Sequence, residues 1–539
     1  MVLHLSGGDF TAGWSRYNLA SVQDQNPGGG RTYYISPDGN DSQDGRSPGR
    51  PWRSLRWLYG LALRPGDRVL LQGGAQYPGF IVLRPGEAGD PAHPVEIGSY
   101  GVGRATLIPP RGVSGITVHN TAGVWIHDLA IIGNPVAYRS QAGIKLYSNL
   151  PGGRKLSGAT INDVDVSGFH NGVEIGGGNG STGFRDVLVS DSRLYGNRDN
   201  GLVSFGPAVH PARPAYAHQH LTVSNVEAFG NLGDPTNHFT SSGNGIVLAS
   251  VDGGVVRHSV AYDNGARCTA PSGPVGIWSF DSAHVTIEHN VSYNNRTGGH
   301  ADGGGFDLDR NVVASYLQYN LAYGNDGPGF MLYSPVTGSA HEGNVVRFNI
   351  SQNDAGKGSY YGGITIGGRV TRSFVYHNTV VVRGRGTAQP AAIVLFGTLD
   401  RVVVWNNIFI AVGTPLIDSH LAFRLSQVAL RGNDLYATAG QWQARWGPSV
   451  YSGLDQWRSA AGQEPGSGVR SIDPGFVYPQ AQRGDGVWLA LGFVPRRRSP
   501  LVGAGVNLRA AGVDLGTLDY LGTPLAGRLT VGAVQPTGA

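Results

Sequence analysis

Short apolar segments that end in Asn, Asp or Ser recur along most of the chain, separated by polar turns. The clearest copies end at Asn290, Asn320, Asn349, Asn378 and Asn407. Their spacings are 30, 29, 29 and 29 residues. Weaker copies extend back to Asp128 and forward to Asn433, and the ten intervals between these two positions average 30.5 residues. The pattern is an internal repeat that covers the middle of the chain.

The repeat is too short for a strand–helix–strand unit, and no helical period of 3.6 fills the intervals. Each coil must therefore bury its apolar residues against the coils above and below it. The sequence predicts an all-β, right-handed parallel β-helix of about eleven coils with N- and C-terminal caps. We expect the recurring asparagines to stack at one turn, where their amides bond backbone groups at the bend.

A second strand recurs in each coil and alternates between inward and outward positions. Its inward residues are Ile144, Val173, Leu202, Ile246, Ile277, Phe306, Phe330 and Ile364. The outward residues that follow them are Lys145, Glu174, Val203, Val247, Trp278, Asp307, Met331 and Thr365. Two positions further along, the outward residues are Tyr147, Gly176, Phe205, Ala249, Phe280, Asp309, Tyr333 and Gly367.

Asp307 and Asp309 lie two positions apart on one such strand, so both carboxylates should leave the same outer face. Their Cα atoms should be ~6.7 Å apart at ordinary strand rise. A carboxyl pair of this kind suits cleavage of a glycosidic bond, in which one acid protonates the leaving oxygen and one carboxylate activates water or attacks. The alternative is that both residues are ordinary solvated positions on an exposed sheet.

The neighbours of this pair favour the catalytic interpretation. Trp278 and Phe280 should lie one coil to one side, and Tyr333 one coil to the other, where aromatic faces can hold a sugar ring. Asp302, in the turn before the strand, is a third candidate catalytic carboxylate. His300 in the same turn and Asp281 after Phe280 are candidate substrate-binding residues.

Composition narrows the possibilities further. Glycine accounts for 85 of 539 residues and charged residues for only 14%, which fits many tight turns. The net charge of +4 is spread thinly and the longest basic run is Arg496–Arg498, so we expect no nucleic-acid partner. Cys268 is the only cysteine, so there is no cysteine-based metal site. We expect no membrane span and see no signal-peptide pattern at the start.

Several stretches resemble bacterial right-handed parallel β-helix enzymes that act on polysaccharides, the pectin-lyase-like superfamily with its glycoside hydrolase-like members. The similar stretches are 33–42, 51–55, 65–70, 302–309, 318–320, 325–330, 499–505 and 531–534. The resemblance implies the fold and a carbohydrate substrate. The acidic and Gly-His motifs of polygalacturonases and the Asp-Pro-His signature of alginate epimerases are missing, so no residue role is transferred from those families.

The leading hypothesis is a polysaccharide-degrading glycoside hydrolase with Asp307, Asp309 and Asp302 as catalytic residues and no cofactor or metal. One alternative is a polysaccharide lyase that uses calcium held by these carboxylates and an Arg or Tyr base such as Tyr333. The other is a noncatalytic glycan-binding or tail-spike-like protein. The expected partner is a polysaccharide or oligosaccharide, and secretion is inferred from this function alone.

The expected organisation follows from the repeat. Residues 1–30 form an N-terminal extension, and 31–100 form a cap, with a short helix near Ser54–Leu63, and the first coils. Residues 101–440 form the β-helix with the catalytic groove, and 441–539 form C-terminal coils and a second cap.

Overall fold

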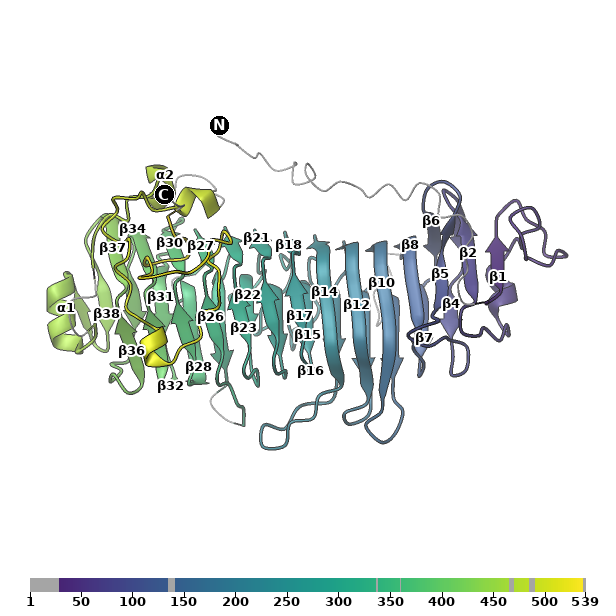
Figure 1. The fold of residues 1–539 in the computed structure, drawn as a ribbon, viewed down its shortest axis with the longest axis horizontal. Helices are drawn as coiled ribbons and strands as arrows, with labels where there is room; N and C mark the ends of the chain where they lie inside the picture. Colours follow the sequence, from purple (N-terminus) through teal and green to yellow (C-terminus); the bar gives the residue numbers. More distant parts are fainter. Residues whose placement is uncertain are drawn as a thin grey trace.

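The computed structural model describes residues 29–133, 141–335, 338–358, 360–464, 470–483 and 490–536. These residues form an elongated right-handed parallel β-helix of about 13 turns (Figure 1). The predicted fold class is confirmed, and the predicted count of about eleven coils is slightly low. The shortfall arises because the first coils, which contain β2 (Arg68–Gln72) and β5 (Val95–Tyr100), have no Asn at the bend and lie outside the repeat that the sequence displays.

Two sheets run the length of the solenoid. The smaller one, sheet B, consists of parallel neighbours closed by one antiparallel strand: β4 (Ile81–Leu83), β7 (Ile116–His119), β9 (Ala142–Ser148), β11 (Asn171–Gly177), β13 (Asn200–Phe205), β15 (Asn244–Ala249), β19 (Val275–Phe280), β22 (Gly304–Leu308), β25 (Phe330–Ser334), β28 (Gly362–Thr371), β31 (Ala391–Leu395), β35 (Ile417–Ser419), β38 (Ala444–Trp446) and the antiparallel β39 (Ser449–Tyr451). The short strand β32 (Thr398–Asp400) pairs with the far end of β28.

The larger one, sheet A, has 24 strands and is folded at a bend. Its strands are β1 (Thr32–Ile35), β2, β3 (Gln76–Pro78), β5, β6 (Ala105–Ile108), β8 (Val124–Ile132), β10 (Lys155–Ser167), β12 (Gly183–Tyr195), β14 (His218–Phe229), β16 (Val251–Asp252), β17 (Val255–Arg257), β18 (Val260–Tyr262), β20 (Thr286–Glu288), β21 (Val291–Tyr293), β23 (Tyr316–Gln318), β24 (Leu321–Tyr323), β26 (Val345–Arg347), β27 (Ile350–Gln352), β29 (Phe374–Tyr376), β30 (Thr379–Arg383), β33 (Val402–Trp405), β34 (Ile408–Val412), β36 (Val428–Arg431) and β37 (Asp434–Ala439).

The bend in sheet A carries the predicted asparagine ladder. Asn320 donates its Nδ2 hydrogen to Asn349 Oδ1 at 3.1 Å, and Asn349 repeats the contact with Asn378 at 3.0 Å. The residue before each of these asparagines has a positive φ, 57° at Tyr319 for example, which side chains other than glycine adopt at a cost. The amide bonds compensate that cost. All five predicted asparagines are buried at this turn, so the prediction is confirmed.

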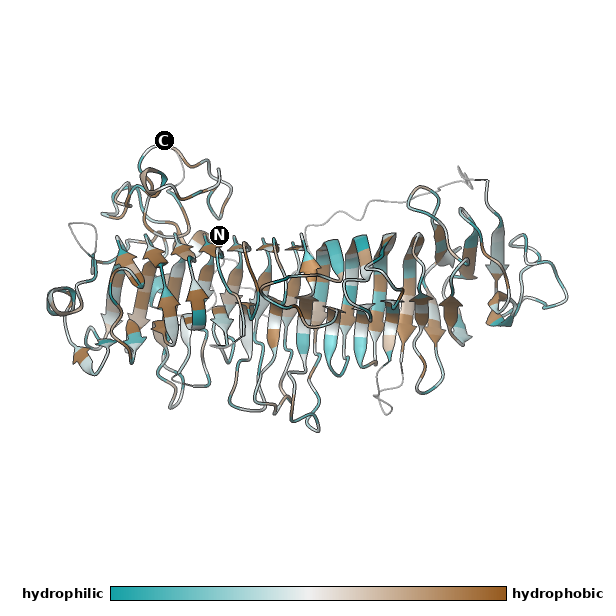
Figure 2. Ribbon diagram, turned by 90° about the horizontal axis from the view of Figure 1, so that it is seen from below, coloured by the Kyte–Doolittle hydropathy of each residue, from teal (hydrophilic) through white to brown (hydrophobic). Residues whose placement is uncertain are grey.

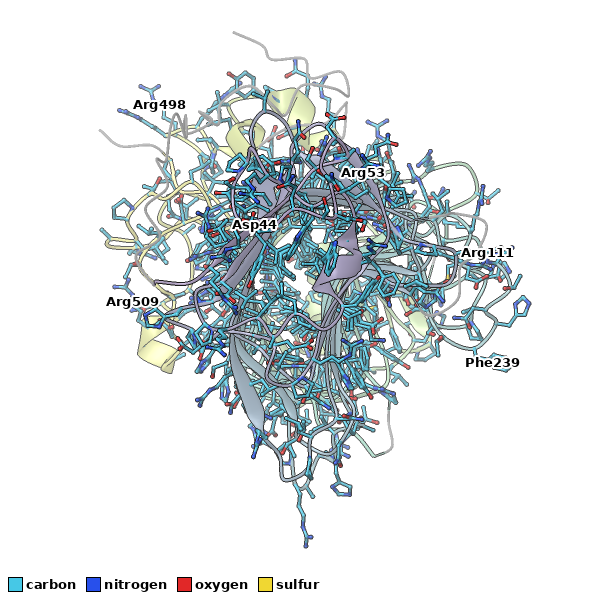
Figure 3. The ribbon with its side chains drawn as sticks, turned by 90° about the vertical axis from the view of Figure 1, so that its right-hand side faces the viewer. Asp44, Arg53, Arg111, Phe239, Arg498 and Arg509 are labelled. Atoms are coloured by element: carbon cyan, nitrogen blue, oxygen red, sulfur yellow. The ribbon has the colours of Figure 1, made fainter. Side chains whose placement is uncertain are left out.

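The core is one continuous stack of apolar side chains. The eight predicted inward residues of sheet B are each at most 1% exposed, as strand alternation required. Figure 2 shows hydrophobic strand residues along the whole length of the solenoid, and Figure 3 shows side chains filling its interior in the end-on view. Burial of this stack along the axis stabilises coils that could not fold alone.

The chain at the two ends of the solenoid departs from the repeating coils. The predicted helix near Ser54–Leu63 is only the 3-10 turn η1 (Leu55–Leu58), whose Leu55 is buried. At the other end of the solenoid lies α1 (Leu454–Ala461) (Figure 1), whose Trp457 is fully buried. The chain after residue 470, with α2 (Pro479–Gln482), η2 (Ala490–Phe493) and η3 (Arg509–Ala511), returns along the side of the solenoid instead. There Tyr319 donates a hydrogen bond to Leu518 O at 3.1 Å.

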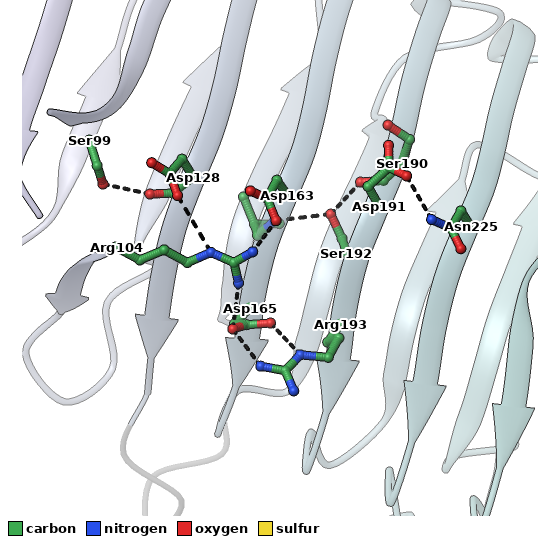
Figure 4. A network of polar contacts seen from close by, with 11 residues as sticks. Ser99, Arg104, Asp128, Asp163, Asp165, Ser190, Asp191, Ser192, Arg193 and Asn225 are labelled. Atoms are coloured by element: carbon green, nitrogen blue, oxygen red, sulfur yellow. Dashed lines mark hydrogen bonds and ion pairs between the residues drawn. The ribbon is translucent and has the colours of Figure 1, made fainter. Parts of the chain in front are cut away.

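Ion pairs tie the coils together on the outer face of sheet A. Arg104 contacts Asp128, Asp163 and Asp165, and Arg193 forms a two-bond contact with Asp165 at 2.7 Å (Figure 4). In the part of the chain that the structure describes, no helix is long and apolar enough to cross a membrane.

Candidate active site

Asp307 and Asp309 occupy the middle of sheet B. Asp307 pairs in register with Trp278 on β19 and with Met331 on β25. The next paired residues are Ser279, Leu308 and Leu332, so Asp309 follows in line with Phe280 and Tyr333. Phe306 and Leu308 point into the core at 0% exposure, which directs both carboxylates to the outer face.

The row that contains Asp307 is buried, although the sequence predicted only that these positions face outward. Asp307 is 2% exposed, Trp278 9% and Met331 5%. One carboxylate oxygen of Asp307, Oδ1, has no hydrogen-bond partner among the described residues. Burial raises the pKa of Asp307 well above its usual value, and the neighbouring Asp309 and Asp302 raise it further. A solvated surface aspartate would show none of these features.

Asp309 is half-buried and more open than Asp307. Burial and the negative charges of Asp302 and Asp281 raise its pKa to about 7. The backbone N–H of Arg310 donates to Asp309 Oδ1 at 2.6 Å, which opposes that rise. Tyr333 lies near the same carboxylates, and burial together with their charges raises the pKa of its hydroxyl.

Asp302 is held by two donors from other coils. The Tyr361 hydroxyl donates to Asp302 Oδ1 at 2.7 Å, and the Gly273 N–H donates to Oδ2 at 2.9 Å. Burial raises the pKa of Asp302, and both hydrogen bonds act in the opposite direction. Of the three carboxyl groups, Asp302 is therefore the one whose ionised form has two donors to stabilise it.

Trp278 is anchored by an amide chain that runs across sheet B. Its Nε1 donates to Asn244 Oδ1 at 2.9 Å. The amide of Asn244 donates to Asn200 Oδ1 at 3.0 Å, and that of Asn200 donates to Asn171 Oδ1 at 2.8 Å. Asn171 in turn donates to Glu174 at 2.9 Å. The indole is also stacked against the ring of Phe280, with centroids 5.1 Å apart. These contacts fix the orientation of the indole beside Asp307.

The other predicted binding residues occupy less direct positions. Asp281 is 4% exposed and accepts hydrogen bonds from Arg310 at 3.4 Å and Asn311 at 2.7 Å, so its carboxylate is engaged within the fold. Phe280 is half-buried, with the Arg310 guanidinium 5.2 Å from its ring centroid. His300 is exposed on the turn before β22. Their roles in substrate binding stay predictions.

Sequence reasoning missed Tyr361, which reaches Asp302 from two coils away, and Asn244, which holds Trp278. The pair Tyr360–Tyr361 directly before the Gly-Gly that opens β28 was the available signal for the first. A surface cavity of about 610 Å³ lies elsewhere, against β29 and β33 of sheet A, and is lined by Arg372, Phe374 and Arg401 among others. The groove expected over the carboxylates stays a prediction.

Among the residues that the structure describes, no three His, Cys, Asp or Glu side chains converge closely enough to hold a metal ion.

The described residues form a parallel β-helix that carries a cluster of carboxyl groups on the outer face of sheet B. No family model matches the chain. A lacto-N-biosidase of Bifidobacterium longum subsp. longum is 23% identical over 448 residues, which is 66% of this chain and 27% of the relative. This chain thus matches only about a quarter of that relative's length.

Two of the solved structures that match this chain have TM-scores below 0.5. The GH136 lacto-N-biosidase from Eubacterium ramulus has a TM-score of 0.49 and 17% identity, over 65% of this chain and 64% of that one. The pectate lyase Pel9A has a TM-score of 0.40 and 16% identity, over 94% and 96% of the two chains.

Proposed function

We propose that this protein is a glycoside hydrolase that cleaves a polysaccharide or oligosaccharide on the outer face of sheet B. The observation that carries the proposal is the cluster of Asp302, Asp307 and Asp309, in which burial raises all three pKa values and neighbouring carboxylates raise those of Asp307 and Asp309 further. Such a cluster keeps carboxylic acids protonated near neutral pH, as a general acid requires.

The three carboxyl groups suit different roles in the reaction. Asp309, half-buried with a pKa of about 7, is the proposed general acid that protonates the leaving glycosidic oxygen as its bond to the anomeric carbon breaks. Asp302 is the proposed carboxylate that activates water or attacks the anomeric carbon, because Tyr361 and Gly273 stabilise its charge. Asp307 is the proposed third catalytic residue, and the charges of Asp309 and Asp302 add to the burial that raises its pKa.

The aromatic neighbours supply the proposed sugar contacts. Trp278, Phe280 and Tyr333 border the carboxyl cluster on both sides along the sheet. Aromatic rings stack on the apolar face of a pyranose while its hydroxyls bond polar groups nearby. Asp281 and His300 complete the proposed binding residues.

The relative named lacto-N-biosidase supports this reaction class, since its name describes cleavage of a glycan. With that support we propose an oligosaccharide or polysaccharide substrate, no required cofactor, and a secreted protein. No nucleic-acid or membrane partner is proposed.

Two observations weigh against the alternatives. A lyase needs a base that loses its proton readily, but burial and nearby carboxylates raise the pKa of Tyr333. A purely glycan-binding protein has no use for three adjacent carboxyl groups whose pKa values burial raises, because such groups lower stability at neutral pH.

The test is a panel of polysaccharides with detection of new reducing ends and of ultraviolet absorbance. Hydrolysis yields saturated products with new reducing ends. Absorbance from unsaturated sugars, lost on addition of a chelator, would establish the lyase instead. Binding without any cleavage by the native protein would establish the binding module.

A further inference from the structure

Sheet B carries two aromatic pairs of matching construction, one on each side of the carboxyl cluster. In the first, the rings of Tyr147 and Phe205 lie 6.5 Å apart at 37°. In the second, the rings of Tyr333 and Phe396 lie 6.3 Å apart at 38°. We call these the 147/205 pair and the 333/396 pair.

A glycine separates the two rings of each pair. Gly176 lies between Tyr147 and Phe205 in register, and a Cβ at this position would come within 2.5 Å of Phe205 Cζ and 2.8 Å of Tyr147 Cδ2. Gly367 pairs in register with Tyr333, and a Cβ there would come within 2.1 Å of Phe396 Cζ. In each case the missing side chain allows rings from alternate coils to lean over the glycine and form one apolar surface.

Both pairs belong to the row that contains Asp309. Counted in strands along sheet B, Gly176 lies four strands from Asp309 on one side and Gly367 two strands on the other. At ordinary strand spacing these separations are ~19 Å and ~10 Å along the axis. An extended chain of pyranose rings advances by roughly one strand spacing per ring, so a single linear chain can reach both pairs and the carboxylates.

Polar groups accompany the more distant pair. Lys145 lies 5.3 Å from the centroid of the Tyr147 ring and forms an ion pair with Glu174 at 2.8 Å. An apolar ring surface bordered by charged hydrogen-bonding groups suits the two kinds of surface that a sugar presents. All four rings are half-buried, which leaves part of each accessible.

We infer that the 147/205 and 333/396 pairs are binding subsites for one linear glycan chain that lies along the solenoid axis, so that cleavage at Asp309 is internal to the chain. The inference rests on the proposed function and specifies its substrate class as an extended polymer. Contacts at both ends of the cluster favour long chains over short ones.

The test compares native protein with Phe205→Ala, Phe396→Ala, Gly176→Ala and Gly367→Ala. The glycine variants keep both rings of a pair but force them apart. The control is Tyr195→Ala, which removes a half-buried ring that stacks on Phe229 at 5.0 Å on sheet A. Substrates are polygalacturonate, alginate, xylan and galactan, each as polymer and as a series of shorter oligomers.

On the polymer that the native protein cleaves, we expect each variant at a pair to raise KM about 5-fold and Tyr195→Ala to leave it unchanged. Oligomers too short to reach the 147/205 pair should respond to neither Phe205→Ala nor Gly176→Ala. Solution viscosity should fall early, before many reducing ends form. Equal effects on all lengths, or release of small products from chain ends only, would overturn the inference.

Binding separates this inference from the proposed function. Retardation of the Asp309→Asn variant in gels containing each polysaccharide measures chain binding without cleavage. If the native protein cleaves nothing, the proposed hydrolase fails. Retardation that Phe205→Ala or Phe396→Ala abolishes would still support the two subsites, and unchanged retardation in both would refute them.

Discussion

The Tyr361 hydroxyl donates a hydrogen bond of 2.7 Å to Asp302 Oδ1 across 59 residues of sequence. The two residues belong to coils separated by the coil of β25, so the bond spans an intervening layer of the solenoid. The neutral Tyr361 hydroxyl thus donates to Asp302, the carboxylate that we propose to be ionised.

Replacement of Tyr361 with Phe removes that donor and keeps the ring. The pKa of Asp302 should rise, because the hydrogen bond lowers it in the native protein. The acidic limb of the kcat/KM profile should therefore move to higher pH, with activity below that limb reduced about 10-fold. Tyr360→Phe is the matched control, since Tyr360 is 49% exposed and precedes Tyr361 directly. An unshifted pH profile of kcat/KM in Tyr361→Phe would mean that Tyr361 has no part in catalysis.

Asp309 should govern the basic limb of the same profile. Its pKa of about 7 means that the proton needed by the leaving oxygen is lost as the pH rises through neutrality. Asp309→Asn should lower kcat about 100-fold on a natural glycan. The loss should be much smaller on an aryl glycoside, whose leaving group needs little protonation. Equal losses on both substrates would contradict the assignment of Asp309 as the acid.

The positions that repeat were predictable from sequence, because each is fixed by one coil and its neighbours. Asn320 and Asn349 had to stack once a 29-residue period was recognised, and Asp307 had to share a face with Asp309 on a strand. The burial of Asp307 was not predictable. Asp307 has the large side chains of Trp278 and Met331 beside it in register, and strand alternation alone does not predict how much of it they cover.

The contacts made by loops could likewise not be predicted from the repeat. The Tyr361–Asp302 bond depends on the lengths and paths of two loops that share no period with the strands. Similarly, the return of the chain after residue 470 along the side of the solenoid rests on contacts such as Tyr319–Leu518, which no local pattern encodes.

The buried carboxyl of Asp307 should destabilise the native protein at neutral pH. Its folded pKa lies well above the ordinary value of 3.8, so between those two values the unfolded chain ionises while the folded protein keeps its proton. Stability is then greatest below the ordinary pKa and declines as the pH rises toward the folded pKa. Asp307→Asn removes this loss. We expect its Tm to exceed that of the native protein near neutral pH and the difference to shrink near pH 4.

Activity distinguishes this stabilisation from a mere surface effect. Asp307→Asn should lose about 100-fold in kcat while gaining stability, because the same buried carboxyl group is needed for catalysis and lowers the stability of the folded protein at neutral pH. A variant that is both fully active and more stable would remove Asp307 from the catalytic residues.

The asparagine ladder should account for a large part of local stability at the bend. Asn320→Ala leaves two buried backbone groups without their partners: Asn290 N–H, which donates to Asn320 Oδ1 at 3.0 Å, and Ile287 O, which accepts from Asn320 Nδ2 at 2.8 Å. Each such group costs roughly 1–3 kcal/mol, so the free energy of unfolding should fall by about 2–6 kcal/mol, seen as a lower urea midpoint. The control is Asn162→Ala on the outer face of sheet A, where the half-buried side chain accepts one bond from Trp125. That change should stay within about 0.5 kcal/mol, because water replaces the lost partner at the surface. Equal effects of the two substitutions would mean that the ladder follows from the fold without stabilising it.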